Sequence, residues 1–134
     1  MSFDIFLGSF KNGIQNEFPL AIAENAFGRF VDRREPECWV LVYPDGGRGD
    51  LYIDDEPMIA GFSVNRPPAH PAFWQGIFDI LSSTTSVLFW AGSGCVVASK
   101  SVIPDLPQDL IDTVGTPTVV TRPEQILEII ERSD

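Results

Sequence analysis

The densest run of chemically capable side chains is the acidic triplet Asp54, Asp55 and Glu56, with Asp50 four residues earlier. Carboxylates bind divalent cations, or act as an acid/base pair, when further oxygens converge on them. Consecutive residues of an extended segment point in different directions, however, and nothing nearby completes a coordination sphere. We therefore interpret Asp50, Asp54, Asp55 and Glu56 as a surface for a basic partner protein, with no metal and no cofactor. A solvated turn between strands is the first interpretation of the triplet, and the partner surface is the hypothesis if the triplet has a function.

His70 is the only histidine, so any catalytic triad, Cys-His pair or histidine-ligated metal would depend on it. It stands in a proline-rich corner just before an amphipathic segment, and a flanking position of a helix explains it sufficiently. Cys38 and Cys95 lie in apolar runs, where a reduced cysteine behaves as a small core residue. Because distant residues can meet in a fold, a small enzyme or ligand-binding domain with an aromatic pocket near His70 stays open as the alternative function.

Two glycine-rich segments match known motifs only in part. Residues 44–49 lack the Gly-Lys-Ser/Thr ending of a phosphate loop and the spaced oxygens of a calcium loop. The tripeptide Arg48-Gly49-Asp50, which extracellular receptors read in other proteins, is interpreted here as a coincidence. Gly92-Ser93-Gly94 lacks the first glycine of a nucleophile elbow. We expect both segments to be hairpin loops.

The charge balance excludes one class of partner. The 134 residues include 19 acidic and nine basic side chains, which gives a net charge of -10. This charge opposes the counterion-release attraction that nucleic-acid binding needs, so we expect neither DNA nor RNA as a ligand. The acids gather in 31–66 and 101–134, on either side of a nearly neutral aromatic centre. That centre makes a homodimer interface a further possibility.

The hydropathy pattern predicts a protein of the cytoplasm. The longest apolar run, around residues 87–91, is the length of a strand and falls short of the roughly 18 residues that a membrane span needs. The opening segment 1–7 lacks the basic region of a signal peptide and contains an acid at Asp4. We therefore expect no contact with a membrane.

Strand patterns recur along the whole chain. The opening segment alternates Ile5 and Leu7 on one face with Phe6 and Phe10 on the other, which predicts a strand buried on much of both faces. Runs of β-branched and aromatic residues predict further strands, arranged as a three-stranded meander and a later hairpin. The predicted strands are 3–10, 38–43, 50–53, 58–64, 86–91, 95–99 and a short one at 118–120.

Four segments have helical patterns, and 71–81 has the clearest, with an apolar stripe suited to packing on a sheet. The stripe consists of Phe73, Trp74, Ile77, Phe78 and Leu81. We expect these side chains, together with Trp39, Trp90, Phe62 and Phe89, to form the core rather than to line a ligand pocket. The first helix should have Pro19 at its first position and Gly28 as its stop. The predicted helices are 19–27, 71–81, 105–114 and 124–131, the third of them ended by Gly115.

Hairpins outnumber βαβ crossovers in this order of elements, which predicts the α+β class. At this length the chain is expected to form a single domain over residues 1–134. Its sheet should be mostly antiparallel or mixed, with three to four helices packed on it.

Three stretches carry a resemblance to known proteins: MSFDIFL at the start, PDGGRGDLYIDD in the centre, and VNRPP followed by FWQGIFDIL. Together they resemble a set of uncharacterised small acidic bacterial proteins over most of the chain, and this resemblance supplies no site residues. In size, acidity and α+β make-up the chain also looks like the immunity proteins that neutralise bacterial toxins. The hypothesis that follows is a non-enzymatic acidic domain that binds a basic protein, with toxin neutralisation as its implied role.

Overall fold

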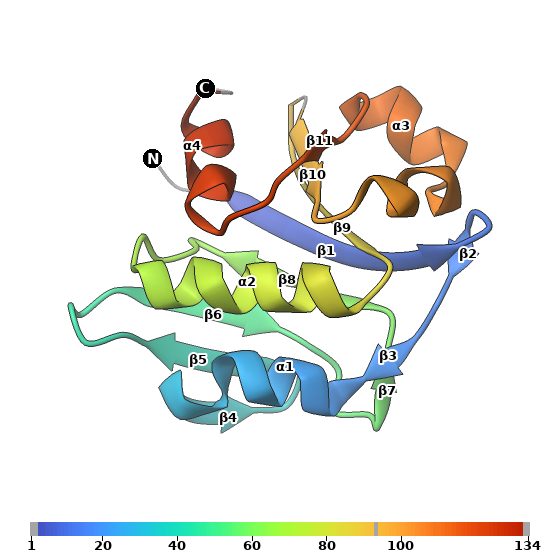
Figure 1. Cartoon of the computed structure of the whole chain (residues 1–134). Coiled ribbons are helices and arrows are strands. Elements are labelled where there is room, and N and C mark those ends of the chain that lie inside the picture. Colours follow the sequence, from blue (N-terminus) through green and yellow to red (C-terminus); the bar gives the residue numbers. More distant parts are fainter. Residues whose placement is uncertain (1–2, 93, 133–134) are drawn as a thin grey trace.

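A large mixed β-sheet organises the chain in the computed structural model, which describes residues 3–92 and 94–132 (Figure 1). Within that part the sheet has nine strands in the order β11-β10-β9-β1-β8-β6-β5-β4, with β2 added to β1, and β3 and β7 pair separately. The pairings are antiparallel except for the parallel pair of β10 and β11. The strands are β1 (Asp4–Lys11), β2 (Ile14–Gln15), β3 (Phe18–Pro19), β4 (Val31–Glu35), β5 (Cys38–Val42), β6 (Arg48–Tyr52), β7 (Met58–Ile59), β8 (Gly61–Asn65), β9 (Ser86–Trp90), β10 (Gly94–Val97) and β11 (Thr118–Val119).

Helices cover the two faces of this sheet unequally. On one face α1 (Leu20–Phe27), α2 (Pro71–Ser83) and α4 (Glu124–Arg132) enclose the main hydrophobic core (Figure 1). On the other face, α3 (Gln108–Val114) and the 3-10 helix η2 (Lys100–Asp105) pack only against β9, β10 and the end of β1. A second 3-10 helix, η1 (Gly28–Phe30), follows α1 directly. The predicted α+β class with a mixed sheet is confirmed.

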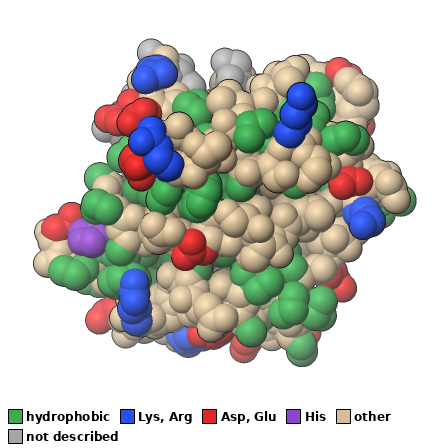
Figure 2. Space-filling model, in the orientation of Figure 1, with side chains coloured by type: hydrophobic (Ala, Val, Ile, Leu, Met, Phe, Trp, Pro, Cys, Tyr) green, Lys and Arg blue, Asp and Glu red, His purple; other side chains and the backbone are tan. Residues whose placement is uncertain are grey.

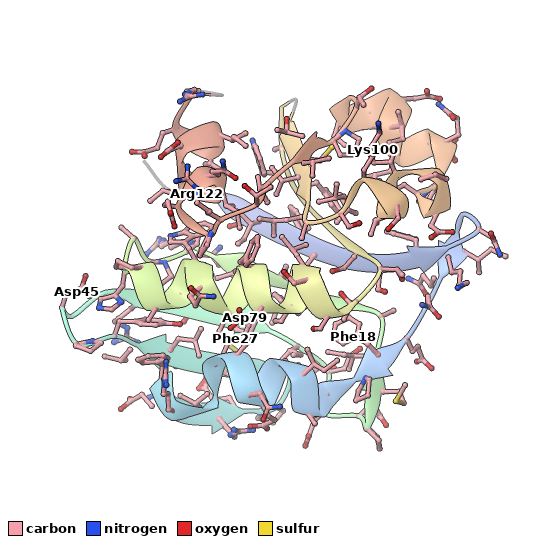
Figure 3. The ribbon with its side chains drawn as sticks, viewed as in Figure 1. Phe18, Phe27, Asp45, Asp79, Lys100 and Arg122 are labelled. Atoms are coloured by element: carbon pink, nitrogen blue, oxygen red, sulfur yellow. The ribbon has the colours of Figure 1, made fainter. Side chains whose placement is uncertain are left out.

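The helix α2 forms where its sequence pattern predicts it. His70 caps the helix, because its Nδ1 accepts a hydrogen bond of 3.0 Å from the Ala72 N–H, and Pro71 occupies the first turn. The apolar stripe faces the core, although Phe78 is only half-buried. Phe27 of α1 lies between the two helices, in contact with Gly76 of α2 (Figure 3). This packing holds α1 and α2 on the same face of the sheet.

The edge strand β4 is absent from the prediction. Its sequence, Val-Asp-Arg-Arg-Glu, has no apolar alternation, and four of its five residues are exposed. Its pairing with β5 is reinforced by Arg34, whose guanidinium lies 4.2 Å from the Trp39 ring and bonds the Glu24 carboxylate at 2.5 and 2.7 Å. Long-range contacts therefore outweigh the low strand propensity of this segment.

Several predicted boundaries are wrong for identifiable reasons. The expected strand 58–64 is broken at Ala60, because β7 pairs with β3 while β8 joins the main sheet. The expected helix 105–114 is shortened by Pro107, which is extended and precedes α3. Pro19 is likewise extended and paired in β3, so α1 starts one residue later. The helix does end at Phe27, but Gly28 has right-handed helical geometry and continues the chain into η1.

The two predicted hairpin loops are confirmed only in part. The β5–β6 loop is shorter than expected, because Arg48 and Gly49 already belong to β6. Asp45 at the loop tip accepts a hydrogen bond of 2.8 Å from the Gly47 N–H (Figure 3). The β9–β10 hairpin is present, and Ser93 in its loop lies outside the described residues.

Candidate functional site

On one face of the sheet, no helix of the described residues covers β8, β6, β5 or the first part of β1. Phe6 illustrates the consequence: the strand β1 buries Ile5 and Leu7 against the helices, but Phe6 on the opposite face is 38% exposed. The expectation that this strand is buried on much of both faces is therefore wrong. Phe89, expected in the core, is half-buried against the smaller core beneath α3 and η2, and its ring also stacks on Phe6, with ring centroids 5.5 Å apart.

The strand register places a row of side chains across the open face. Phe89, Phe6 and Ser63 are successive cross-strand partners, and the row continues through Tyr52 to Cys38. Phe6, Ser63 and Tyr52 also line a hollow of about 580 Å³, which we name the aromatic hollow. Its lining also includes Phe10, Phe89, Met58, Gly8 and Gly61, and its acidic lining residues are Glu17, Asp54 and Glu56.

A second hollow, of about 690 Å³, lies at the β4–β5 turn, and we name it the acidic hollow. Its lining consists of Arg34, Glu35, Pro36, Glu37, Trp39, Asp54, Asp55 and Glu56. Five carboxylates thus face one guanidinium, and that guanidinium is already held by Glu24 and the Trp39 ring. The hydrogen bonds between Arg34 and Glu24 lower the pKa of Glu24 and raise the pKa of Arg34. The hollow therefore presents a negative surface that its own arginine offsets only partly.

The segment Asp54, Asp55 and Glu56, which we name the acidic loop, separates the two hollows. Both of its ends are fixed: the Ile53 N–H donates to the Glu37 carbonyl oxygen at 3.1 Å, and the Leu20 N–H donates to the Pro57 carbonyl oxygen at 2.9 Å. The three carboxylates between these anchors are exposed. The fold therefore holds the loop in place and leaves its charges available to solvent.

Not all of the predicted contact residues come together. Asp54, Asp55 and Glu56 are adjacent at the hollows, whereas Asp50 lies in the middle of β6, half-buried between Val40 and Asn65. Asp50 lines neither hollow. Glu35 and Glu37 were not predicted as part of this surface, because it is the β4–β5 turn that brings them to the acidic loop. The only sequence feature that indicates them is the Glu-Pro-Glu run, which is typical of an exposed turn.

His70 and the cysteines lie elsewhere. Besides capping α2, the His70 ring stacks on Tyr43 at 5.4 Å, and burial raises the pKa of the Tyr43 hydroxyl. Cys95 is buried beneath α3, where its thiol donates to the Gly115 carbonyl oxygen at 3.3 Å and burial raises its pKa to about 11. Cys38 is only half-buried on the open face, so the core interpretation holds for Cys95 alone. Both cysteines are free.

A third, smaller hollow of about 300 Å³ lies between α2 and α4. Ala69 and Pro71, on either side of His70, line it together with Trp74, while His70 itself does not. The buried Trp74 indole N–H has no hydrogen-bond partner among the described residues. Over the same residues no cluster of three His, Cys, Asp or Glu side chains is arranged to hold a metal ion.

Comparison with protein-family models, with curated proteins and with solved structures gives no match to this chain. Among the described helices, none has the length and apolarity to cross a membrane. On the helix-bearing face, acidic, basic and hydrophobic side chains are interspersed (Figure 2). The strongest candidate for a functional site is therefore the acidic loop with the two hollows beside it.

Proposed function

We propose that this protein is a non-enzymatic cytoplasmic domain that binds a basic protein partner through the acidic loop. The observation that carries the proposal is the position of Asp54 and Glu56, which line both hollows and so join an acidic surface to an aromatic one. Charges that are exposed at the rim of a binding surface raise the association rate and select the sign of the partner, while apolar contacts supply affinity.

The lack of internal partners for the loop carboxylates supports the proposal. Asp54 and Glu56 make no hydrogen bond or ion pair within the described residues, and Asp55 has only an electrostatic interaction with Arg34. Glu35 and Glu37 add to the same negative surface from the β4–β5 turn. A lysine- or arginine-rich surface of another protein would neutralise this cluster.

Toxin neutralisation is the specific role that we propose within this class. A toxin that acts on nucleic acid needs a basic surface to bind its substrate. An acidic inhibitor that covers such a surface would block substrate binding and associate quickly.

Affinity capture tests the proposal. The wild-type protein and the variant D54N/D55N/E56Q are used as baits for a lysate of the source organism, at low and then at moderate salt. We expect wild type to retain a stoichiometric basic protein that salt releases, and the variant to retain much less. The variant E124Q/E128Q/E131Q is the matched control, because it makes the same change in net charge on α4. Equal retention by wild type and D54N/D55N/E56Q would contradict the proposal.

A ligand-binding role near His70 is the second candidate. It is favoured by the unpartnered Trp74 N–H beside the hollow between α2 and α4. A thermal-shift screen of small molecules distinguishes the two, because a ligand that binds only the native state raises the unfolding temperature. This candidate predicts a stabilising compound whose effect Trp74→Phe weakens, because that variant removes the unpartnered indole N–H beside the hollow.

A further inference from the structure

The aromatic hollow specifies what kind of basic segment the partner presents. We propose that it holds one aromatic side chain of the partner, flanked by lysine or arginine residues that pair with Glu17, Asp54 and Glu56. This inference rests on the proposed function, since the same acidic loop attracts the partner. It adds an apolar anchor on the open face of the sheet.

Two paired glycines leave part of the hollow without side chains. Gly8 and Gly61 are directly opposite each other in β1 and β8. A Cβ atom at Gly61 would collide with the Leu7 carbonyl oxygen, and one at Gly8 would lie 2.9 Å from the Phe10 ring. Neither position can therefore carry a side chain without moving its neighbours. The depression between the aromatic walls follows from this close approach of the two strands.

Exposed apolar surface is concentrated at this hollow. Five large hydrophobic side chains of the described residues are exposed, and three of them, Phe6, Tyr52 and Met58, line it. Tyr52 is 48% exposed and Met58 is 43% exposed. A cluster of exposed apolar groups with a polar rim is typical of a protein-binding surface. The stacked pair of Phe6 and Phe89 offers an aromatic side chain a flat partner for ring contacts.

The charges around the hollow select a basic occupant. Among the described residues, its charged lining consists of Glu17, Asp54 and Glu56, without a lysine or an arginine. A second copy of this chain, docked face to face, would bring the same carboxylates together, and the whole protein carries a net charge of -10. Charge complementarity therefore favours a basic partner over a homodimer.

Three blocked pentapeptides test this inference on the whole protein: Lys-Lys-Phe-Lys-Lys, Lys-Lys-Ala-Lys-Lys and Glu-Glu-Phe-Glu-Glu. Each is titrated at low salt while the amide chemical shifts of the protein are recorded. We expect the phenylalanine lysine peptide to bind about tenfold more tightly than the alanine peptide, because a phenyl ring leaves water. Only that peptide should shift Phe6, Tyr52 and Phe89, and the acidic peptide should not saturate.

Each other outcome overturns a different statement. Equal affinity of the two lysine peptides at the acidic loop refutes the aromatic anchor and leaves the proposed function standing. Failure of both lysine peptides to bind there refutes both proposals. Saturable binding of the acidic peptide refutes charge selection. Concentration-dependent self-association that Phe6→Thr abolishes would assign the hollow to a homodimer instead.

Variants of the protein locate the anchor. Phe6→Thr should lower the affinity for the phenylalanine peptide to that for the alanine peptide, without changing the latter. Tyr52 also lines the hollow, so Tyr52→Thr should lower the affinity for the phenylalanine peptide as well. This second variant serves as the test if Phe6→Thr fails to fold. Val119→Thr is the matched control, because Val119 is a 40% exposed strand residue outside the lining of the hollow. An unchanged tenfold preference in both Phe6→Thr and Tyr52→Thr would overturn the assignment.

Discussion

Neutralising Asp54 and Glu56 should leave the fold as stable as wild type, or more stable. Neither carboxylate has a hydrogen bond or ion pair within the described residues, and both line a hollow that three other carboxylates share. Two unit charges about 8 Å apart in water repel by about 0.5 kcal/mol, and 0.15 M salt reduces this to about 0.2 kcal/mol. Asp54 and Glu56 are each repelled by Glu35 and Glu37 and attracted by Arg34, whereas repulsion within the acidic loop persists in the unfolded chain. One net repulsion of about 0.5 kcal/mol then remains for each carboxylate, so D54N/E56Q should gain about 1 kcal/mol at low salt.

Urea unfolding at low salt and at 1 M salt measures this difference. The gain should disappear at high salt, because screening removes the repulsion. The control E124Q/E128Q removes carboxylates that lie 3.7 Å from Arg122 and 3.9 Å from Arg132, so it should instead lose up to about 1 kcal/mol. If D54N/E56Q lost more than about 1 kcal/mol at low salt, the loop carboxylates would support the fold, and their assignment to an external partner would be wrong.

Three further predictions concern groups outside the hollows. Burial raises the pKa of the Cys95 thiol to about 11, so the stability that its neutral form contributes is present below about pH 9 and falls as the pH rises toward 11. Cys95→Ala should remove that fall in urea unfolding at pH 9–11. The hydrogen bond from Arg34 lowers the pKa of Glu24, so the stability that the ionised Glu24 contributes is present above about pH 4.5 and is lost as the pH falls through the lowered pKa. Glu24→Gln should therefore cost less than about 1 kcal/mol of unfolding free energy at pH 7, and the stability of this variant should fall less steeply in acid. His70→Ala removes the cap of α2 and should cost about 0.5–2 kcal/mol in urea unfolding, with unchanged affinity for lysine peptides.

Local patterns predicted the elements whose apolar residues face the core. In α2 the stripe from Phe73 to Leu81 has both a helical period and a proline start, and its burial follows directly. The meander of β5, β6 and β8 and the hairpin of β9 and β10 were equally clear, because turn residues separate strand-forming runs.

The missing elements depend on contacts between distant residues. The strand β4 is held by Arg34, which lies over the Trp39 ring of β5 and bonds the Glu24 carboxylate of α1. The position of β1 in the middle of the sheet, between β8 and β9, brings segments far apart in sequence together. Local hydrophobic periodicity does not specify which distant strands pair, so the strand order could not be predicted from the sequence.

The candidate site could be predicted only for its acidic part. A run of three acids at a turn identifies Asp54, Asp55 and Glu56 from sequence alone. The aromatic part could not be predicted, because alternation cannot tell that the face bearing Phe6 lacks a covering helix. Only the arrangement of α3 and η2, which stop short of β8, leaves that face open.

The most direct test of the account is the chemical-shift map of Lys-Lys-Ala-Lys-Lys on the wild-type protein at low salt. Because this peptide has no aromatic anchor, it reports the acidic loop alone. We predict saturable shifts at Asp54, Asp55 and Glu56 that extend to Glu35 and Glu37. High salt should reverse these shifts, and the variant D54N/D55N/E56Q should abolish them. Shifts centred on the acids of α4, or spread evenly over the acidic surface, would contradict it.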